Sequence, residues 1–198
     1  MEISARKILQ LLYYIQKSSA NTDFCGGIMY LIKIMFFADR YHLRKYGVTA
    51  SGDVYYAMKR GPVASVALNL LHNRRSNYVN SAEAGIEDEV EAIDEYTVRI
   101  KEQNDDELSE SVKEAVNFAL DHFGKFDQFK LSDISHIYPE WKKCETELEK
   151  GGKKRLQLDL SLCFTDPDNK DLQKYGIKSD PFADSPEFLA EMREAFVG

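Results

Sequence analysis

The stretch that decides the fold is GIMYLIKIMFFADRYHLRKYG, residues 27–47. Its first half is apolar on nearly every side of a helix, which predicts a helix over residues 26–46 in the middle of the fold. Its second half turns polar, and Arg44 and Lys45 suit the negative end of the helix dipole. Gly47 suits the left-handed position that often follows a helix. We therefore predict a fold built around one central helix.

Hydrophobic periodicity on both sides of the central helix predicts further helices and a few short strands. The expected helices cover residues 3–17, a segment opened by Gly61-Pro62 with Val63, Val66, Ala67, Leu70 and Leu71 on its apolar face, residues 108–123 behind a cap at Asp105 or Asp106, residues 131–147 as one helix or a pair broken before Pro139, and a short segment after Ser185-Pro186. The expected strands cover residues 54–59, 96–101 with Val90 on the hairpin partner, and 156–163. The fold class is mainly α with a small β element (α+β): a single compact helical domain with a short antiparallel sheet or hairpin. Trp141, the only tryptophan, should anchor its segment in the core.

The composition fits one acidic domain. The chain has 198 residues and is 43% hydrophobic, which is enough for one core and too little for two large ones. Charged residues make up 30% of it, and the formal net charge is −7. An acidic chain is a poor default binder of nucleic acid or anionic membrane, because phosphate neutralisation needs surplus Lys and Arg.

Cysteine usage and hydropathy point to a cytoplasmic protein. Cys25, Cys144 and Cys163 are far apart and form no CxxC pair, so they predict no disulfide framework or zinc site and favour a reducing compartment. The N-terminal MEISARKILQ lacks the apolar region of a signal peptide. The longest apolar stretch, residues 28–38, is interrupted by Lys33 and is too short to span a bilayer, which takes about 20 residues.

The charge is unevenly distributed along the chain. Residues 1–80 contain eleven Lys and Arg against four Asp and Glu. Such asymmetry indicates either a docking surface or an intramolecular complement, and a solvated surface with no role is an equal alternative. Basic side chains and tyrosines also alternate here, as in proteins that bind single-stranded nucleic acid. These residues are Arg40, Arg44, Lys45, Lys59, Arg60, Arg74 and Arg75 with Tyr41, Tyr46, Tyr55, Tyr56 and Tyr78. A basic face that complements the acidic 83–110 segment or a protein partner is the favoured interpretation, because the whole chain is acidic.

Catalytic and metal-binding patterns find little support. Asp39 and His42 are three residues apart on the central helix, so their side chains could meet as part of a hydrolase site. No GxSxG elbow supplies a nucleophile, and a polar helix end whose groups satisfy one another is favoured. Neither HExxH nor paired CxxC is present, so we predict no metal and no cofactor. Gly26-Gly27 and Gly151-Gly152 lack the context of phosphate-binding loops.

Three blocks of sequence are more specific than composition or periodicity. They are FADRYHLRKYG at residues 37–47, SGDVYYAMKRGPVAS at 51–65 and LSDISHIYPEW at 131–141. Their order and spacing resemble the signature of the Panacea domain, the SocA-like antitoxin domain, over roughly residues 5–150. The chain departs from that pattern at residues 48–51, VTAS, where a proline-bearing linker is expected.

The resemblance implies a mostly helical domain with a small β element that acts as an antitoxin and not as an enzyme. Members of this family neutralise unrelated protein toxins by direct contact, related members act as adaptors that hand a toxin to a protease, and the family also occurs in prophages. The implied partners are a cognate toxin and, in the adaptor alternative, a cytoplasmic protease. A phage or prophage accessory binding protein is a further alternative.

The signature region supplies the candidate partner-binding residues, which are Asp39, Arg40, His42, Arg44, Tyr46, Asp53, Tyr55, Tyr56, Arg60 and Pro62. Of these, Tyr55 or Tyr46 with Arg44 or Arg60 would be sensible exposed hot spots. Much of the signature could equally hold the fold, with Asp39 and Arg40 tying the helix end to the Asp53 turn, because glycine, proline and packed aromatics normally serve geometry.

Two parts are expected in the chain: an antitoxin domain at 1–164 and a polar C-terminal tail at 165–198. The tail carries a short amphipathic helix with Leu189, Met192 and Phe196 on one side. This stripe could engage a protease or the toxin, although packing on the domain's own core is favoured.

Overall fold

The computed structural model describes residues 3–74, 76–78, 83 and 85–197. Its α-helices are α1 (Ala5–Ser18), α2 (Ile28–Tyr46), α3 (Ser65–Leu71), α4 (Glu110–Phe123), α5 (Gln128–Ser135), α6 (Pro139–Glu149), α7 (Asn169–Gln173) and α8 (Pro186–Val197). Its strands are β1 (Tyr55–Met58), β2 (Gly61–Ala64), β3 (Val90–Ala92), β4 (Val98–Ile100) and β5 (Arg155–Gln157), and short 3₁₀ helices are η2 (Ile86–Glu89), η3 (Asp105–Glu107) and η4 (Leu160–Phe164). The fold is mainly α with a small β element, as predicted.

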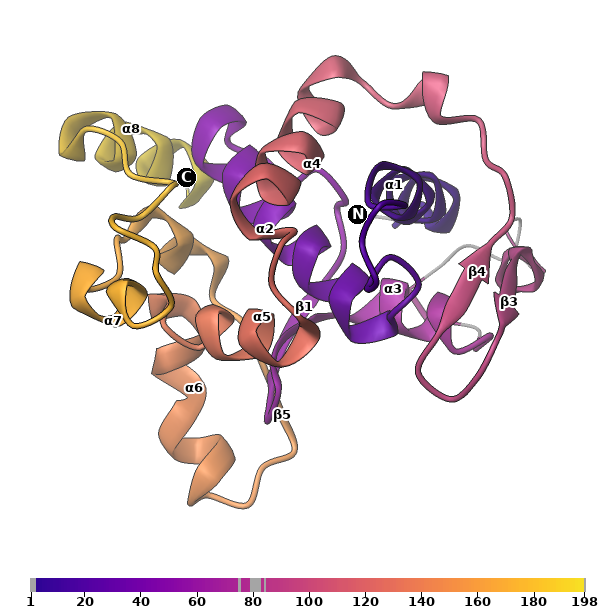
Figure 1. The fold of residues 1–198 in the computed structure, drawn as a ribbon. Helices are drawn as coiled ribbons and strands as arrows, with labels where there is room; N and C mark the ends of the chain where they lie inside the picture. The colour runs from indigo at the N-terminus through magenta and orange to yellow at the C-terminus, as the bar shows by residue number, and fades with distance from the viewer. Residues whose placement is uncertain (1–2, 75, 79–82, 84, 198) are drawn as a thin grey trace.

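Helix α2 runs through the middle of the molecule, as its sequence predicts. Helix α1 and the β3–β4 hairpin lie on one side of it, and α6, α7 and α8 lie on the other (Figure 1). Helix α4 makes the most extensive helix contact with α2, and there the rings of Phe37 and Phe123 stack with centroids 4.0 Å apart. The helix begins at Ile28, two residues later than predicted, and Gly47 closes it in the left-handed conformation at φ 76°.

The three-stranded sheet corrects one prediction. Strand β1 pairs antiparallel with β2 and with β5, in the order β2-β1-β5. Gly61-Pro62 was expected to open a helix, but it opens β2, with Pro62 opposite Ala57. Proline is tolerated there because β2 is an edge strand and needs fewer ladder hydrogen bonds. Helix α3 starts at Ser65, and its predicted apolar face, apart from Val63, is buried.

The β3–β4 hairpin is fastened to the start of α2. Val90 lies on the hairpin partner of β4, as predicted, and is paired there with Ile100. The backbone N–H of Val98 donates to Gly26 O at 2.8 Å. A Cβ on Gly26 would lie 3.0 Å from Val98 O, so the close approach favours glycine here. Tyr96, expected inside the strand, instead lies before it in the turn, where its carbonyl accepts a 2.9 Å hydrogen bond from Ile28 N.

The remaining helix boundaries follow local chemistry. The N-cap of α4 is Ser109, whose hydroxyl accepts from Val112 N; Asp105, one of the two caps predicted, begins η3 instead. Of the two arrangements expected for residues 131–147, the pair broken before Pro139 is formed, since Tyr138 is extended at ψ 140° and separates α5 from α6. Trp141 is buried, and its indole N–H donates to Met58 O at 3.0 Å, so it anchors α6 to β1.

The C-terminal segment supplies side chains to the core although its sequence is polar. The strand expected at 156–163 is shorter and continues into η4. Leu172 and Phe182 belong to the main hydrophobic cluster, and the ring of Phe182 stacks on Phe123 with centroids 5.5 Å apart. In α8, Leu189 is buried and Met192 packs against the cluster around Leu43. The stripe of α8 therefore contacts the protein's own core, which was the favoured alternative.

Among the described residues, no helix has both the length and the apolar character needed to cross a membrane.

Candidate functional site

The signature residues at the C-terminal end of α2 are held by internal hydrogen bonds. The carboxylate of Asp39 accepts from Ser51 N at 2.7 Å, from the hydroxyl of Ser51, and from the Tyr55 hydroxyl at 2.6 Å. Burial raises the pKa of Asp39, and these hydrogen bonds act in the opposite direction. Asp39 therefore ties α2 to the loop that leads into β1, as one of the two interpretations expected.

Asp53 caps the N-terminus of α3, although it lies 12 residues before that helix. Its carboxylate accepts from Val54 N at 2.6 Å, Val66 N at 3.0 Å and Ala67 N at 2.9 Å. The last two are unpaired donors of the first turn of α3, whose own N-cap residue, Ala64, has no side-chain acceptor. Burial nevertheless raises the pKa of Asp53 to about 6. This candidate residue holds the β-element against α3.

Arg40 forms a buried ion pair with a residue that sequence reasoning did not single out. Its Nη1 lies 2.6 and 2.7 Å from the two carboxylate oxygens of Glu140 at the start of α6. Both side chains are fully buried. Nη2 donates to Thr165 O at 2.9 Å, and the guanidinium lies 4.3 Å from the centre of the Tyr138 ring. The expected tie from Arg40 to the Asp53 turn is therefore wrong, because the guanidinium joins α2 to α6.

His42 and Asp39 do not hydrogen-bond to each other. The imidazole of His42 pairs instead with Val48 O at 2.7 Å through Nδ1 and with the Ser111 hydroxyl at 3.1 Å through Nε2. The geometry of a His–Asp dyad, on which the hydrolase alternative rested, is not formed. Both residues act as internal connectors, which is the polar helix end expected from the sequence.

Arg44 is also buried, so the expectation that it is exposed is wrong. Its guanidinium donates to Cys163 O at 2.8 Å and to Asp166 at 2.6 Å, and burial lowers its pKa. Tyr55 is buried as well, beneath Asp39. Neither side chain is available as a surface hot spot in this structure.

Three candidates reach the surface. Tyr46 is 39% exposed and hydrogen-bonds to Glu114. Tyr56 is half-buried, with its hydroxyl 2.8 Å from that of Tyr78 and the guanidinium of Arg155 4.6 Å from its ring centre. Arg60 is exposed in the turn between β1 and β2. The tenth candidate, Pro62, is buried.

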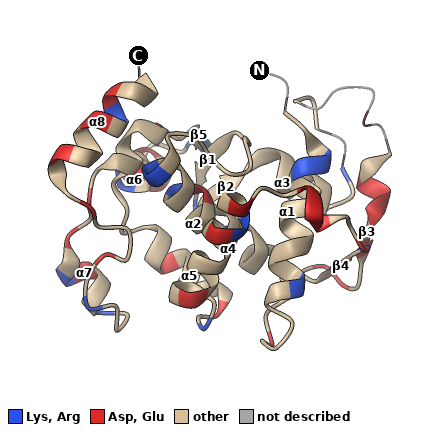
Figure 2. Ribbon diagram, turned by 90° about the horizontal axis from the view of Figure 1, so that it is seen from above, with Lys and Arg blue, Asp and Glu red and all other residues tan. Residues whose placement is uncertain are grey.

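Part of the uneven charge is an intramolecular complement: four of the eleven basic residues in 1–80 form described ion pairs. Each ion pair that the structure describes for a base of residues 1–80 reaches an acid beyond residue 100; the pairs are Lys17–Asp105, Arg40–Glu140, Arg44–Asp166 and Lys45–Glu114. Figure 2 shows acidic stretches of ribbon in α8 and beside β3, on opposite sides of the molecule. Arg40, Arg44 and Tyr55 are buried and do not belong to a basic face, while Arg75 lies outside the described residues.

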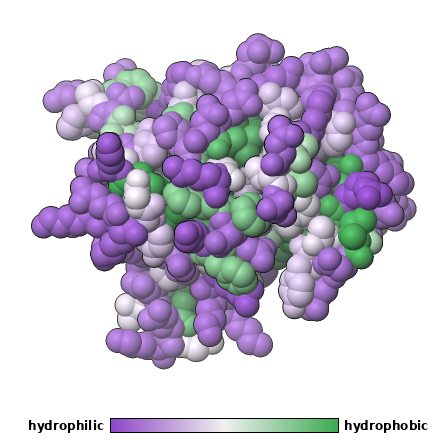
Figure 3. Space-filling view, in the orientation of Figure 1, coloured by the Kyte–Doolittle hydropathy of each residue, from purple (hydrophilic) through white to green (hydrophobic). Residues whose placement is uncertain are grey.

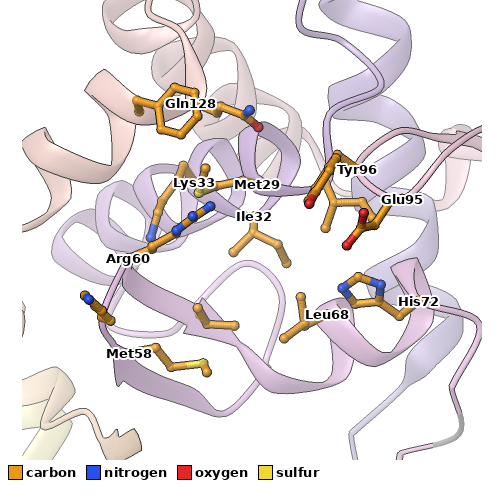
Figure 4. Close-up of a pocket in the computed structure, with 14 residues that line it drawn as sticks. Met29, Ile32, Lys33, Met58, Arg60, Leu68, His72, Glu95, Tyr96 and Gln128 are labelled. Atoms are coloured by element: carbon orange, nitrogen blue, oxygen red, sulfur yellow. The ribbon is translucent and has the colours of Figure 1, made fainter. Parts of the chain in front are cut away.

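A groove of about 600 Å³ lies at the other end of α2. Its lining comes from five segments: the first turns of α2, the β1–β2 turn, α3, the β3–β4 turn and the start of α5. Ile32 and Met29 lie at the back of it, with Arg60 on one side and Tyr96 and Glu95 on the other (Figure 4). Because these segments are far apart in sequence, periodicity could not have assembled the groove.

Two exposed aromatic residues line the groove. Tyr96 is 62% exposed and Phe129 is 59% exposed. On the face shown in Figure 3, apolar groups surface in several separate places among hydrophilic side chains, so exposure alone does not mark one face. The groove is distinguished because its exposed rings flank a concave, mainly apolar lining.

Lys33 forms part of the groove wall and is only 1% exposed. Its ammonium group donates to Pro62 O at 2.8 Å, and burial lowers its pKa to about 7. A side chain on Gly61, which has φ 94°, would collide with the Lys33 ammonium group and the Ser135 hydroxyl. Sequence reasoning noted Lys33 only as an interruption of an apolar run, and that interruption was the available signal.

The described residues show no metal centre. Among them, no three His, Cys, Asp or Glu side chains gather in a way that could hold a metal ion. Cys144 and Cys163 are buried free thiols, and Cys25 is a half-buried one.

The fold and its polar connections define a helical domain with a groove and a signature that serves mainly to hold it together. The family model described as antitoxin SocA-like, Panacea domain matches residues 31–142, more than half of the chain. The chain belongs to this family. The matched region runs from α2 into α6 and contains the Arg40–Glu140 pair and the groove lining apart from Ile28 and Met29. No curated protein and no solved structure matches the chain.

Proposed function

We propose that this protein is the antitoxin of a toxin–antitoxin pair, and that in the cytoplasm it neutralises its toxin by direct binding rather than by catalysis. Membership of the SocA-like antitoxin family supports the class of function. A stoichiometric binder needs an interface of about 1,600 Å² in total, which a domain of this size provides.

The observation that carries the placement of the interface is the groove. Tyr96 and Phe129 are exposed aromatics beside an apolar concave lining, and such residues dominate the energetics of protein interfaces. Arg60 reaches the same groove from a signature block and adds the other residue type that is enriched in hot spots. The signature residues at the opposite end of α2 are instead engaged in internal hydrogen bonds.

The test is co-expression of this chain with the protein encoded beside it, scoring both growth rescue and co-purification. Rescue with a stable complex is expected. Arg60→Glu and Phe129→Ser are expected to abolish rescue, because they reverse the charge of the groove rim and remove an anchor ring. Arg193→Glu is the matched control, since Arg193 is exposed on α8, which packs at the other end of α2.

Tyr46→Ser separates the groove from the other exposed signature position. If Tyr46→Ser abolishes co-purification while Arg60→Glu and Phe129→Ser leave it intact, the interface lies at the C-terminal end of α2 and the placement in the groove is wrong. If the neighbouring protein is harmless alone and nothing co-purifies, the antitoxin function itself loses its support.

The adaptor alternative requires its own experiment. Deleting residues 165–198 would remove Leu172 and Phe182 from the core and the Arg44 partner Asp166, so truncation would disturb the whole domain. Substitutions of exposed residues on α8, such as Arg193→Glu, leave the core intact. Faster turnover of the toxin in cells with this antitoxin than without it, abolished by such a substitution, would support recruitment of a protease through α8.

A further inference from the structure

Lys33 carries a positive charge into the wall of the groove without a carboxylate partner. An ammonium group has three donors, and Pro62 O is the one acceptor that the described part of the chain supplies. No described Asp or Glu lies within ion-pair distance of it, whereas the equally buried Arg40 on the same helix has both oxygens of Glu140. Buried charges are normally paired, so Lys33 is an exception that needs an explanation.

The groups that face Lys33 do not compensate its charge. On the β1–β2 turn, Lys59 and Arg60 are both basic. At the end of α5, His136 has its pKa lowered to about 4, by burial first and then by Lys33 itself, so it is neutral at pH 7. Glu95 lies across the groove beside Tyr96, away from Lys33 (Figure 4). One end of the groove is therefore basic in a chain whose net charge is −7.

We propose that this basic end of the groove receives a carboxylate from an acidic side chain of the partner protein, while an apolar residue next to it fills the groove between Ile32 and Phe129. This inference rests on the proposed function, because it names the chemistry of the segment that the antitoxin recognises. A carboxylate offers the acceptors that the Lys33 ammonium lacks, and the Arg60 guanidinium reaches it from the rim. The apolar lining then excludes water from the pair.

Proton uptake is the signature of this arrangement. Free Lys33 has a pKa of about 7, so at pH 8 it is mostly neutral. A carboxylate against the ammonium group favours the charged form and raises the pKa. Binding at pH 8 then takes up close to one proton, and affinity falls as the pH rises above about 7, because the lysine must be charged to pair. A groove that binds only through apolar contacts shows neither effect at Lys33.

The decisive experiment is calorimetry of the full-length protein with the co-purifying toxin at pH 8, in two buffers of different ionisation enthalpy. For the unmodified protein we expect uptake of about one proton. Lys33→Met should abolish the uptake and weaken binding at least tenfold at pH 6.5, roughly the loss that follows truncation of one partner of a buried charge pair. Lys45→Met, the same substitution at an exposed position of α2, is the matched control and should change neither quantity.

Lys33→Met that retains both the affinity and the proton uptake of the unmodified protein overturns the inference, while the antitoxin function stands. A thermal melt of Lys33→Met verifies that the variant folds, and Arg60→Gln offers a second route because it weakens the pair from the surface without touching the buried lysine. Arg60→Gln should reduce affinity and keep the proton uptake.

A peptide titration tests the site without the toxin. The probes are acetyl-leucyl-glutamyl-phenylalanine amide and its glutamine counterpart, with the Lys33 side-chain signals followed by NMR. We expect the glutamate peptide alone to shift these signals and to raise the pKa of Lys33. If neither peptide does so at millimolar concentration, the carboxylate site is wrong. A response to the peptide in a protein that neutralises no toxin would keep the site and remove the proposed function.

Discussion

The two ends of α2 differ in how their polar groups are satisfied. At the C-terminal end, Asp39, Arg40 and Arg44 have partners in the β1 loop, α6 and the segment after η4. At the N-terminal end, the Lys33 ammonium group has one backbone carbonyl, Pro62 O, as its hydrogen-bond acceptor, and the apolar side chains beside Lys33 line an open groove. One helix thus combines charged groups that have side-chain partners with a buried lysine that has only a backbone carbonyl as its partner.

The comparison separates two roles: most signature residues hold the fold together, whereas the groove residues are the ones that we propose contact the partner protein. Three of the most distinctive signature residues, Asp39, Arg40 and Asp53, are buried and act as connectors, so they fix the position of α2 relative to its neighbours. Arg60 is the exposed signature residue on the rim, and most of the lining, apart from Met58, Lys59 and Val63, comes from parts of the chain outside the three signature blocks. The polar C-terminal end fixes the position of α2, and we infer that the groove at its N-terminal end binds the partner protein.

The largest effect is expected from breaking the network at Arg40. Arg40→Met leaves the Glu140 carboxylate fully buried without its partner, which should lower the free energy of unfolding by about 3–5 kcal/mol. Urea denaturation of the two proteins measures this difference. The double variant Arg40→Met with Glu140→Leu should recover most of the loss, because it removes both charges. Equal destabilisation in the single and double variants would mean that packing, and not charge pairing, dominates here.

A substitution of Lys33 in the groove is expected to change the free energy of unfolding in the opposite direction. Lys33→Met should raise the free energy of unfolding by about 2 kcal/mol at pH 6, because it removes an unpaired buried charge at the cost of one hydrogen bond. The folded-state pKa of about 7 lies below the ordinary 10.5, so the burial penalty is complete below pH 7 and fades as the pH rises towards 10.5.

Thermal or urea unfolding from pH 6 to pH 10 measures the difference between Lys33→Met and the unmodified protein. The advantage of the variant should shrink steadily as the pH rises. A constant advantage would show that Lys33 titrates near its ordinary pKa.

The smallest effect is expected at the surface of the signature end. Glu114 accepts from Tyr41, Lys45 and Tyr46, and the hydrogen bond from Lys45 is the largest cause that lowers its pKa to about 2. Because the pair is exposed, Glu114→Gln should cost less than about 1 kcal/mol, and less still at high salt. The contribution is present above the ordinary pKa of 4.5 and is lost as the pH falls towards 2. Chemical denaturation at low and high salt detects it; a loss unaffected by salt would contradict an electrostatic origin.

The parts of the fold that depend on local pattern could be predicted from the sequence. The apolar run of α2, the glycine after it and the break before Pro139 each act through neighbouring residues, and the structure has all three. The edge strand that contains Pro62 was missed, because a proline after a glycine suits a helix start equally well and only pairing with β1 decides between them.

The site depends on contacts that no local pattern encodes. Glu140 is 100 residues from Arg40 in the chain, so its role could not be assigned from its position within LSDISHIYPEW. Tyr96 and Phe129 were overlooked for the groove because their exposure depends on where the hairpin and α5 are fastened. Arg60 was among the predicted candidates and does line the groove. Lys33 also carried a readable signal, since a lysine within an otherwise apolar central helix indicates a buried charge.

The ring of Phe182 has a consequence for synthesis of the chain. It packs on Phe37 and Phe123 in the core, and Thr165 and Asp166 complete the contacts of Arg40 and Arg44. A nascent chain that stops short of these residues leaves apolar rings and two arginines uncovered at the centre of an otherwise finished domain. Completion of this fold therefore waits until the segment from Thr165 to Phe182 has been synthesised, and chains released before that point expose a hydrophobic surface that quality-control proteases recognise.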